Sequence, residues 1–359
     1  MDALLGTILH ELRPRLAAWY PDIDPDVEPY VVHDDDRAVA RVLQLRIARN
    51  TGEPVGIIVK AGSPPPSANI EERPRLVPTT EGPIRRTLEL DALRMVEARL
   101  AAVGDPRFAA VRALGILPES EALVMEELDG RPLHRLLMWR LFRRQSTTNP
   151  RRLVSAAGAL LRVLHETPPA GQAVRQGRPK DLVQGFHAFG EYLSGSAGIP
   201  GLEPVVAAGA AAAAALPDPL PTVISHGDFA PRNLLVDRSG RLAMIDLLAR
   251  WRAPPYEDLA TFLVALETNR ANAATRGVLF GRAFRQLRPA FLSGYFGEEP
   301  VPHEAIRVYE LLLLLDKWSA RAMRNQPRRG VRRLPGLLID RHFEARSRAL
   351  ARRLRQAVA

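Results

Sequence analysis

The stretch VISHGDFAPRNLLVD, residues 223–237, most constrains the fold because it sets polar residues between two apolar, strand-like runs. His226, Asp228 and Asn233 fall within one short turn, and a further apolar run at 241–247 follows closely. Apolar runs that end at turn residues are typical of buried strands. The chain must therefore hold three polar side chains beside buried segments, either as a structural hydrogen-bond network or as a reaction centre.

The amino-acid composition excludes several kinds of chemistry. The 359 residues include no cysteine, so thiol nucleophiles, disulfides and cysteine metal sites are excluded, and a reducing cytoplasm is the expected setting. We expect no transmembrane segment, because the longest bland run, at 205–216, is shorter than the roughly 20 residues that span a bilayer. A secretory signal is not expected either, since residues 1–16 carry early acidic residues and no small-residue cleavage site.

The formal net charge of +10 is concentrated towards the C-terminal end. Residues 301–359 contain 14 Lys and Arg but 5 Asp and Glu, and they include Arg328, Arg329, Arg332 and Arg333. A basic region of this kind favours an anionic ligand, a membrane surface or nucleic acid. Nucleic acid is the least favoured partner, because no nucleic-acid motif or interleaved aromatic pattern accompanies the charge. The alternative is a solvated, arginine-rich helical surface.

The first 128 residues combine strand-like and helical segments. The predicted strands are 29–32, 38–48, 54–60, 107–117 and 121–128, with turns at 33–37 and 49–53. The predicted helices are 3–19 and about 85–103, and the Pro-rich, charged residues 61–83 form a loop. After Gly130 the pattern becomes mostly helical, interrupted by one β-hairpin at the motif described above.

The polar residues around this hairpin suit phosphoryl transfer from ATP. That reaction needs a carboxylate that orients the attacking hydroxyl, oxygen ligands that hold Mg²⁺ on the phosphates, and a cation. Asp228 and Asn233 share one loop, and Asp246 lies on the next strand beyond the turn at 236–241. Because a hairpin returns the chain to its start, Asn233 and Asp246 can converge on one ion, with Asp228 in front of them.

The segment HGDFAPRN, followed by MIDLLARWRAPPYEDLATF, resembles the aminoglycoside phosphotransferase and choline kinase-like family of small-molecule kinases. Over about residues 38–265, IIVK, TLELDALRMV, ALVMEELDGRPL and LLRVLHE resemble further family features in the same order. The resemblance implies an α+β, protein-kinase-like bilobal fold with a small antiparallel β-sheet N-lobe and a mainly helical C-lobe. The expected lobes are 1–128, which binds nucleotide and includes the helix 3–19, and 129–359, which binds the acceptor and carries the catalytic residues.

The resemblance also implies roles for individual residues. Asp228 matches the catalytic base, His226 an orienting residue that braces its loop, and Asn233 and Asp246 the Mg²⁺ ligands. Asp258 opens the DLATF helix, which it can cap, and the matching family residue supports the catalytic loop. Arg232 is adjacent to the site and is compatible with a phosphate contact or with a surface role, whereas His134 and His165 are interpreted as packed structural histidines.

Further matching residues belong to the expected nucleotide site. Lys60 matches the phosphate-contacting lysine and Glu89 its partner, although Asp91 and Glu97 lie on the same predicted helix. The strip whose backbone would meet the adenine of ATP, or the base of another nucleoside triphosphate, is Met125, Glu126, Glu127 and Leu128.

One family feature is missing. A glycine-rich phosphate loop would fall between the first two predicted strands, where the chain has His33, Asp34, Asp35 and Asp36. Three carboxylates beside ATP would repel it unless they point away. This departure leaves open a donor other than ATP, or a homologue without activity.

These features favour a cytoplasmic, Mg²⁺- and ATP-dependent enzyme that phosphorylates a hydroxyl of a small molecule. The alternatives are a kinase-fold protein that acts on proteins and a non-catalytic binding module. Only eleven residues separate Asp246 from Asp258 and no A-P-E motif follows, which is too short for a peptide-docking segment. An aminoglycoside-type antibiotic kinase also stays open. A polycationic acceptor needs an acidic pocket, however, and the C-terminal lobe is basic, so a sugar or another neutral or anionic acceptor is expected.

Overall fold

The computed structural model describes residues 2–24, 26–37, 40–50, 52–62, 73–76, 82–142, 149–269, 272–273, 275, 278, 281–325 and 334–358. Arg328, Arg329, Arg332 and Arg333, and most of the predicted loop 61–83, lie outside these residues. The chain divides into two compact units, each built from separate stretches of sequence. Unit 1 comprises Met1–Ile70, Thr79–Arg131 and Leu235–Leu248, and unit 2 comprises Glu71–Pro78, Pro132–Leu234 and Ala249–Ala359. Of the helices described, none has both the length and the apolar character that crossing a bilayer requires.

Unit 1 is built around a five-stranded antiparallel sheet with the strand order β1-β2-β3-β5-β4. Its strands are β1 (Tyr30–Arg37), β2 (Ala40–Ile47), β3 (Val55–Gly62), β4 (Ala113–Leu117) and β5 (Ala122–Glu126). In β3, buried and partly buried side chains alternate strictly, because successive side chains of a strand point to opposite faces. The small antiparallel sheet predicted for the N-terminal lobe is therefore confirmed.

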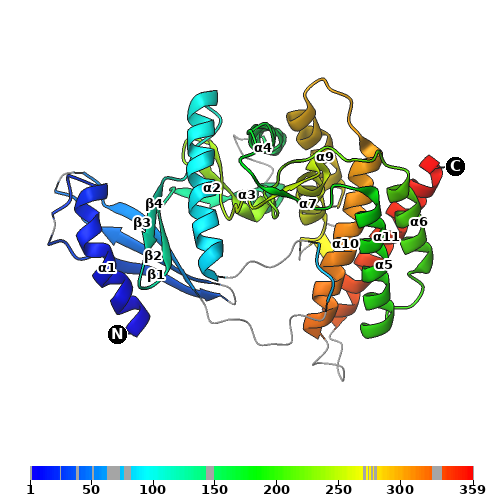
Figure 1. The fold of residues 1–359 in the computed structure, drawn as a ribbon, viewed down its shortest axis with the longest axis horizontal. Coiled ribbons are helices and arrows are strands. Elements are labelled where there is room, and N and C mark those ends of the chain that lie inside the picture. Colours follow the sequence, from blue (N-terminus) through cyan, green and yellow to red (C-terminus); the bar gives the residue numbers. More distant parts are fainter. Residues whose placement is uncertain are drawn as a thin grey trace. The chain divides into compact units, whose positions relative to one another are not determined.

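Each face of this sheet is covered by one helix (Figure 1). The helix α1 (Ala3–Trp19) begins at Asp2, whose side chain accepts a hydrogen bond from the Leu4 nitrogen at 3.0 Å. Its residues Ile8, Leu12 and Leu16 pack in one core with buried side chains of β2 and β3. On the opposite face, α2 (Gly82–Val103) packs against alternate side chains of β5. The central strands β3 and β5 are thus covered on both faces within unit 1, whereas Tyr30 and Val32 of the edge strand β1 are exposed.

The predicted turn at 33–37 is wrong, because these residues continue β1 and pair with β2. The Asp34 carboxylate accepts hydrogen bonds from Arg41 at 2.9 and 2.6 Å, and Arg41 also contacts Asp2. Its hydrogen bonds with Arg41 lower the pKa of Asp34. The positive charge of Arg41 on the neighbouring strand therefore compensates the negative charge of Asp34, so residues 33–37 can form part of the sheet.

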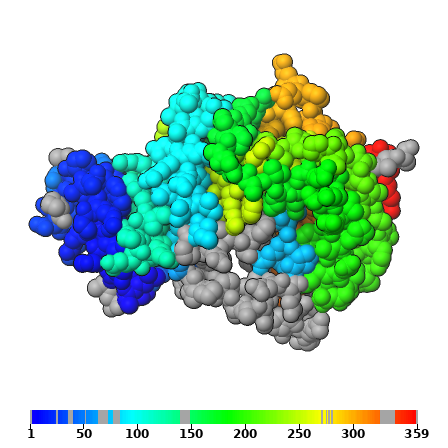
Figure 2. All heavy atoms as spheres, viewed as in Figure 1, coloured from blue at the N-terminus to red at the C-terminus, as the bar shows by residue number. Residues whose placement is uncertain are grey.

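Unit 2 consists mainly of helices, as predicted. They are α3 (Leu133–Phe142), α4 (Pro150–His165), α5 (Pro179–Glu191), α6 (Glu203–Ala214), α7 (Pro255–Glu267), α9 (Gly281–Phe296), α10 (His303–Asn325) and α11 (Leu334–Val358). A core that includes Phe186, Leu312 and Trp318 joins α5, α6, α10 and α11, and α5 and α6 form part of the green surface of Figure 2. A Cβ at Gly158 of α4 would lie 2.2 Å from the Phe291 carbonyl oxygen of α9, so their close approach requires glycine.

Two three-stranded sheets each combine strands that come before and after the HGDFAPRN motif in the sequence. One, in the order β7-β11-β8, contains β7 (Ala173–Val174), β8 (Val223–Ile224) and β11 (Trp251–Ala253). The other, in the order β10-β9-β6, contains β6 (Gly130–Pro132), β9 (Leu234–Asp237) and β10 (Leu242–Met244). The strands β9 and β10 form the predicted hairpin, and Leu235–Leu248, which contains most of it, belongs to unit 1.

A short segment that lies between β3 and α2 in the sequence belongs to unit 2. In this docked segment, residues 73–76, Arg73 Nη1 donates a hydrogen bond to Asp316 Oδ1 at 2.7 Å. The Leu76 carbonyl oxygen accepts a hydrogen bond from Arg175 Nη1 at 2.6 Å. The Leu76 side chain is buried in the core of unit 2. Two hydrogen-bonded anchors and one apolar anchor therefore fix this segment to the helical unit.

Candidate active site

The loop after β8 carries the polar residues of the HGDFAPRN motif. Gly227 has a φ of +79°, a left-handed conformation that glycine adopts without a side-chain clash, and it turns the chain just before Asp228. A 3-10 turn, Pro231–Asn233, then leads into β9. Between these two points Phe229 is fully buried and stacks on Phe291, with ring centroids 6.4 Å apart. The loop is therefore anchored to the core of unit 2 immediately beside its charged residue.

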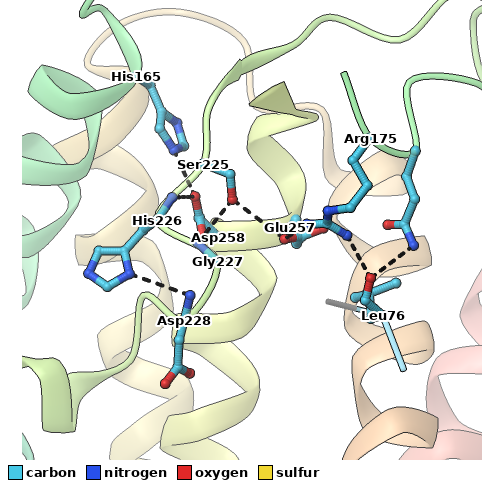
Figure 3. Close-up of polar contacts among 10 residues, drawn as sticks. Leu76, His165, Arg175, Ser225, His226, Gly227, Asp228, Glu257 and Asp258 are labelled. Carbon is cyan, nitrogen blue, oxygen red and sulfur yellow. Dashed lines mark hydrogen bonds and ion pairs between the residues drawn. The ribbon is translucent and has the colours of Figure 1, made fainter. Parts of the chain in front are cut away.

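A buried carboxylate from α7 holds the backbone of this loop (Figure 3). Asp258 accepts hydrogen bonds from the backbone N–H groups of His226, at 2.7 Å, and Gly227, at 2.9 Å. His165 Nε2 lies 3.2 Å from the same carboxylate. Burial acts to raise the pKa of Asp258, but the hydrogen bonds and charge of its partners, His165 first, outweigh it and lower that pKa. The brace is thus an ionised carboxylate at neutral pH.

Asp258 does not cap its helix, which corrects the prediction from sequence. The helix α7 begins at Pro255 with Pro254 at the N-cap, so Asp258 lies within the first turn. The orphan N–H groups that its carboxylate satisfies belong to the loop after β8 instead. The ring of His226 also faces this turn, since its Nδ1 lies 3.4 Å from the backbone nitrogen of Asp228.

Glu257, next to Asp258, makes a second buried ionic contact. Arg175 Nη2 lies 2.5 Å from Glu257 Oε1, and the Ser225 hydroxyl lies 3.5 Å from the same oxygen. Burial raises the pKa of Glu257 to about 7, although Arg175 acts in the opposite direction. Because Arg175 also donates to the Leu76 carbonyl, one guanidinium links the docked segment to the buried acid behind the catalytic loop.

Asp228 points away from this brace (Figure 3), and its side chain is 44% exposed. Arg232 Nη2 lies 2.6 Å from Asp228 Oδ1 and 2.5 Å from Oδ2. The Asn233 amide donates to Asp228 Oδ2 and to the Asp228 carbonyl oxygen, both at 2.9 Å. The structure therefore brings Asp228 and Asn233 together on one loop and adds Arg232 to them.

In unit 1, Lys60 lies between two carboxylates. Its Nζ contacts Glu89 of α2 and Asp246, which follows β10. Burial acts to lower the pKa of Lys60, but the two carboxylates outweigh it and raise that pKa, so the amine stays charged. Asp246 has a φ of +60°, a conformation uncommon for residues other than glycine and often retained at functional sites. Three residues predicted for nucleotide and metal binding thus meet in one cluster.

The strip predicted to meet the nucleotide base, residues 125–128, overlaps the last two residues of β5 and continues two residues beyond it. Its acidic side chains are used within unit 1: Glu126 accepts a hydrogen bond from the Tyr20 hydroxyl at 3.2 Å, and Glu127 contacts Arg46. The backbone N–H of Glu127 donates to the carbonyl oxygen of β3 residue Gly56 at 2.8 Å. Any contact of this strip with a base must therefore come from its other backbone groups.

Unit 2 contains a pocket of about 1060 Å³ that is lined in part by Ala230, Pro231 and Arg232 of the loop after β8. This volume is ample for a small-molecule ligand. The other linings come from α3, α7, α9, α10 and α11 and from residues that follow α7 in the sequence. The charged residues among the described linings are Arg232, Asp316, Lys317 and Arg321. Asp316 is paired with Arg73 of the docked segment at 2.7 Å, Arg321 with Asp340 at 3.0 Å and Arg232 with Asp228. With these partners counted, four positive and three negative charges among the described residues lie at the pocket, so its net charge is weakly positive.

Two neighbours of the brace were not predicted from the sequence. His165 was interpreted as a packed structural histidine. It is buried, as expected, and its ring also contacts the carboxylate of Asp258. Arg175, the partner of Glu257, was not singled out, because it lies 82 residues before Glu257 and no local pattern marks it. The one available signal was the pair of adjacent acids in YEDLATF, since two buried acids in one helical turn need partners.

The predicted metal ligands, Asn233 and Asp246, offer an amide oxygen and a carboxylate oxygen. Within the described ranges, no group of three His, Cys, Asp or Glu side chains is arranged to hold a metal ion. One amide oxygen and one carboxylate oxygen fit Mg²⁺, which proteins commonly hold through one or two carboxylates together with phosphate oxygens and water. They do not fit a closed structural site of the zinc type.

Comparisons with known proteins point in one direction. The sequence matches the model of the phosphotransferase enzyme family over residues 30–301. A comparison with curated protein sequences finds no match.

Solved structures of several kinases share the fold. A choline/ethanolamine kinase family protein from Mesorhizobium loti has a TM-score of 0.54 and 17% identity, covering 95% of this chain and 94% of its own. Choline kinase LicA from Streptococcus pneumoniae has a TM-score of 0.54 and 14% identity, covering 95% and 97%. A spectinomycin phosphotransferase in complex with ADP and spectinomycin has a TM-score of 0.51 and 14% identity, covering 97% and 98%. The fold is therefore protein-kinase-like.

Proposed function

Because the chain belongs to the phosphotransferase enzyme family, we propose that it transfers the terminal phosphoryl group of ATP, in the presence of Mg²⁺, to a hydroxyl of a small molecule. The observation that carries the proposal is the environment of Asp228. This exposed carboxylate stands on a loop that Asp258 and Phe229 fix from behind. The same loop lines the large pocket of unit 2.

Asp228 is proposed as the group that orients the acceptor and takes its proton. As the acceptor oxygen forms its bond to the γ-phosphorus, the bond from that phosphorus to the β,γ-bridging oxygen breaks and ADP leaves. The hydroxyl proton passes to the Asp228 carboxylate. Phosphoryl transfer depends mainly on positioning and electrostatic stabilisation, which is why a braced backbone at His226 and Gly227 suits this role.

Lys60 and Asp246 are proposed to serve the donor. The charged amine of Lys60 would bind nucleotide phosphates, with Glu89 holding it in place. Asp246 and Asn233 would hold Mg²⁺, which when bound offsets the negative charge of the phosphates. The relative that was crystallised with ADP and spectinomycin supports a nucleotide donor. The backbone of residues 125–128 is the proposed contact for the base.

The pocket supports a neutral or anionic acceptor, such as a sugar. Its described linings include three cationic side chains, Arg232, Lys317 and Arg321, against one carboxylate, Asp316. That carboxylate is paired with Arg73, whereas Arg232 is paired with Asp228 and Arg321 with Asp340, so the pocket keeps a small excess of positive charge. A polycationic aminoglycoside would meet repulsion there, because like charges close together in a partly desolvated site disfavour binding.

The basic C-terminal region is proposed to contact an anionic ligand or a membrane surface. The end of α11 supports this, since Arg352, Arg353 and Arg355 are all exposed. Replacing these three arginines with glutamine should weaken binding to vesicles that contain anionic lipid, and the loss should shrink as salt increases. Equal vesicle binding by the wild type and the variant would indicate that this region is only a solvated, arginine-rich surface.

The function is tested by incubating the purified protein with Mg²⁺ and ATP against sugars, amino alcohols, hydroxy acids and aminoglycosides. ADP release and the mass of the product report transfer, and the matched control is Asp228→Asn. A phosphorylated hydroxyl product that the wild type makes and the variant does not make supports the proposal. ADP release without a phosphorylated product, at equal rates in both proteins, would contradict it.

A further inference from the structure

Arg232 contacts the catalytic carboxylate in an unusual way. A single nitrogen of its guanidinium, Nη2, reaches both oxygens of Asp228, at 2.6 and 2.5 Å. A guanidinium has five N–H donors in a fixed plane, so Nε and Nη1 carry three donors beyond this contact. Among the residues that the structure describes, Asp228 is the hydrogen-bond partner of this side chain. The pairing therefore uses only one edge of the guanidinium.

The rest of Arg232 is available to a ligand. Its side chain is 50% exposed, and the residue lines the pocket of about 1060 Å³. An exposed Arg–Asp pair four residues apart contributes little to the stability of a fold, so fold stability gives no strong reason for an arginine at this position. A guanidinium beside the proposed base and at the pocket wall is instead well suited to bind carboxylate or phosphate.

The surroundings of Arg232 are cationic. Lys317 and Arg321 of α10 line the same pocket. Burial, together with the cations Arg135 and Arg232, lowers the pKa of His134, so this imidazole is neutral at neutral pH and adds no charge of its own. The carboxylate of Asp316 is paired with Arg73. Arg321 is paired in turn with Asp340 at 3.0 Å, so an anion that enters the pocket meets a wall with a small excess of positive charge.

We propose that Arg232 selects acceptors that carry an anionic group, a carboxylate or a phosphate, close to the hydroxyl that is phosphorylated. Nη2 stays on Asp228 while Nη1 binds the anion, so one planar group aligns the base and the acceptor. The proposal rests on the proposed function and narrows its substrate class from neutral or anionic hydroxyl compounds to anionic ones, such as sugar acids or sugar phosphates.

The terminal phosphate of the nucleotide is a second source of the same anion chemistry, and a binding experiment separates the two. Inorganic phosphate is titrated into the full-length protein, first alone and then with saturating Mg²⁺ and a non-hydrolysable ATP analogue. Wild type is compared with Arg232→Gln, with Arg232→Lys, and with the control Arg241→Gln. Arg241 pairs with Asp237 four residues before it and is also 50% exposed, so it matches Arg232 in pairing and exposure.

With the analogue bound, Arg232→Gln should raise the Kd for phosphate about tenfold or more, because hydrogen bonds to charged groups are lost. Arg232→Lys should recover part of the affinity, since it keeps the charge but not the planar fork, and Arg241→Gln should bind as wild type does. Phosphate binding that the analogue abolishes would assign Arg232 to the nucleotide and overturn the proposal. Binding that is absent from wild type, or unchanged in Arg232→Gln, would overturn it as well.

This experiment does not depend on turnover. If wild type phosphorylates no hydroxyl compound, the proposed function fails while the phosphate titration still reports on Arg232. If turnover is found, the substrate class is checked with D-glucuronate and D-glucose, which carry a carboxylate and a hydroxymethyl group, respectively, at the same carbon. Arg232→Gln removes the contact with Asp228 for both acceptors but an anion contact only for the acid, so kcat/KM should fall by a clearly larger factor for the acid than for the neutral sugar, and equal losses for both would contradict the assignment.

Discussion

The carboxylate of Asp258 accepts a hydrogen bond from the backbone N–H of His226 at 2.7 Å and a second one from the backbone N–H of Gly227 at 2.9 Å. Asp258 and His226 lie on different elements, α7 and the loop after β8. A buried, ionised side chain thus sets the path of the backbone that presents Asp228. The geometry of the proposed base therefore depends on a residue that does not touch the acceptor.

Replacing Asp258 with asparagine should loosen this loop. The amide keeps one acceptor oxygen, but its NH₂ group faces a backbone donor, so one buried N–H loses its partner. We expect the free energy of unfolding to fall by about 1–3 kcal/mol. The displaced loop should lower kcat by about 10²-fold, the cost of a small misplacement of a catalytic group. Urea unfolding and steady-state kinetics measure the two effects.

The control for this variant is Asp181→Asn. Asp181 also accepts a hydrogen bond from a backbone N–H, that of Arg178 at 3.3 Å, but at the start of α5. It should lose stability without a comparable loss of kcat. Unchanged kcat in Asp258→Asn, with reduced stability, would show that the loop keeps its active conformation without this brace.

Asp228→Asn keeps the shape of the side chain and removes the proton acceptor. General-base contributions are typically about 10²–10⁴-fold, so kcat should fall by that order while the Kd for nucleotide changes little. The paired measurement of kcat and nucleotide Kd separates a base from a structural residue. Wild-type kcat would remove Asp228 from the mechanism, and loss of nucleotide binding would assign it to metal or fold.

Glu89→Gln tests the partner of Lys60. The variant removes one of the two carboxylates that contact the buried amine, so the amine should be held less firmly and kcat/KM for ATP should fall by about tenfold. Asp91→Asn is the matched control, because Asp91 lies on the same helix but is exposed. Equal effects of both substitutions would show that the Lys60 contact has no role in ATP use.

Asp246→Ala and removal of Mg²⁺ by a chelator should each abolish ATP-dependent turnover. Both remove what is proposed to position the phosphates, and positioning supplies most of the catalysis in this reaction class. Titration of Mg²⁺ back into the chelated enzyme should restore wild-type turnover but not that of the variant. Undiminished turnover in Asp246→Ala would exclude this residue as a metal ligand.

Glu257 should make stability depend on pH. Its folded-state pKa of about 7 lies above the ordinary value of 4.5, because the carboxyl is buried. The folded protein therefore holds this proton more tightly than the unfolded chain does. Stability is lost as pH rises from about 4.5 to about 7, and the loss is complete above that range.

Glu257→Gln should remove this dependence. Between pH 5 and pH 8 the free energy of unfolding of wild type should fall by about 2–3 kcal/mol relative to the variant, since one pKa unit corresponds to about 1.4 kcal/mol. Urea denaturation of both proteins at a series of pH values measures the difference. Parallel curves for the two proteins would show that Glu257 does not titrate in this range.

The sequence predicted those features that local patterns encode. The β-branched run before Lys60 indicated a strand, which the structure extends two residues further to Gly62, and the apolar spacing around Glu89 indicated a helix. The hairpin followed from two apolar runs around a tight turn. Side-chain directions repeat every 2 residues in a strand and every 3.6 residues in a helix, so a short stretch of sequence is enough to indicate either element.

The features that depend on distant residues could not be predicted in the same way. Residues 33–37 have the composition of a turn. They form a strand because Arg41 on the next strand compensates the charge of Asp34. From local sequence alone Asp258 resembles a helix cap, and only the family resemblance indicated its use by the loop at His226, 32 residues away, because that use depends on tertiary packing. The same holds for Arg73, whose partner Asp316 lies 243 residues later.

The interleaving of the two units along the chain has a consequence for how this protein can change over evolutionary time. Lys60 and Asp246 belong to the same unit, yet they are 186 residues apart, with much of unit 2 encoded between them. A single recombination event at the junction near Arg131 would separate them and would also part Arg73 from Asp316. New acceptor preferences in this lineage should therefore arise by point substitutions along the pocket wall, not by the exchange of whole modules between genes.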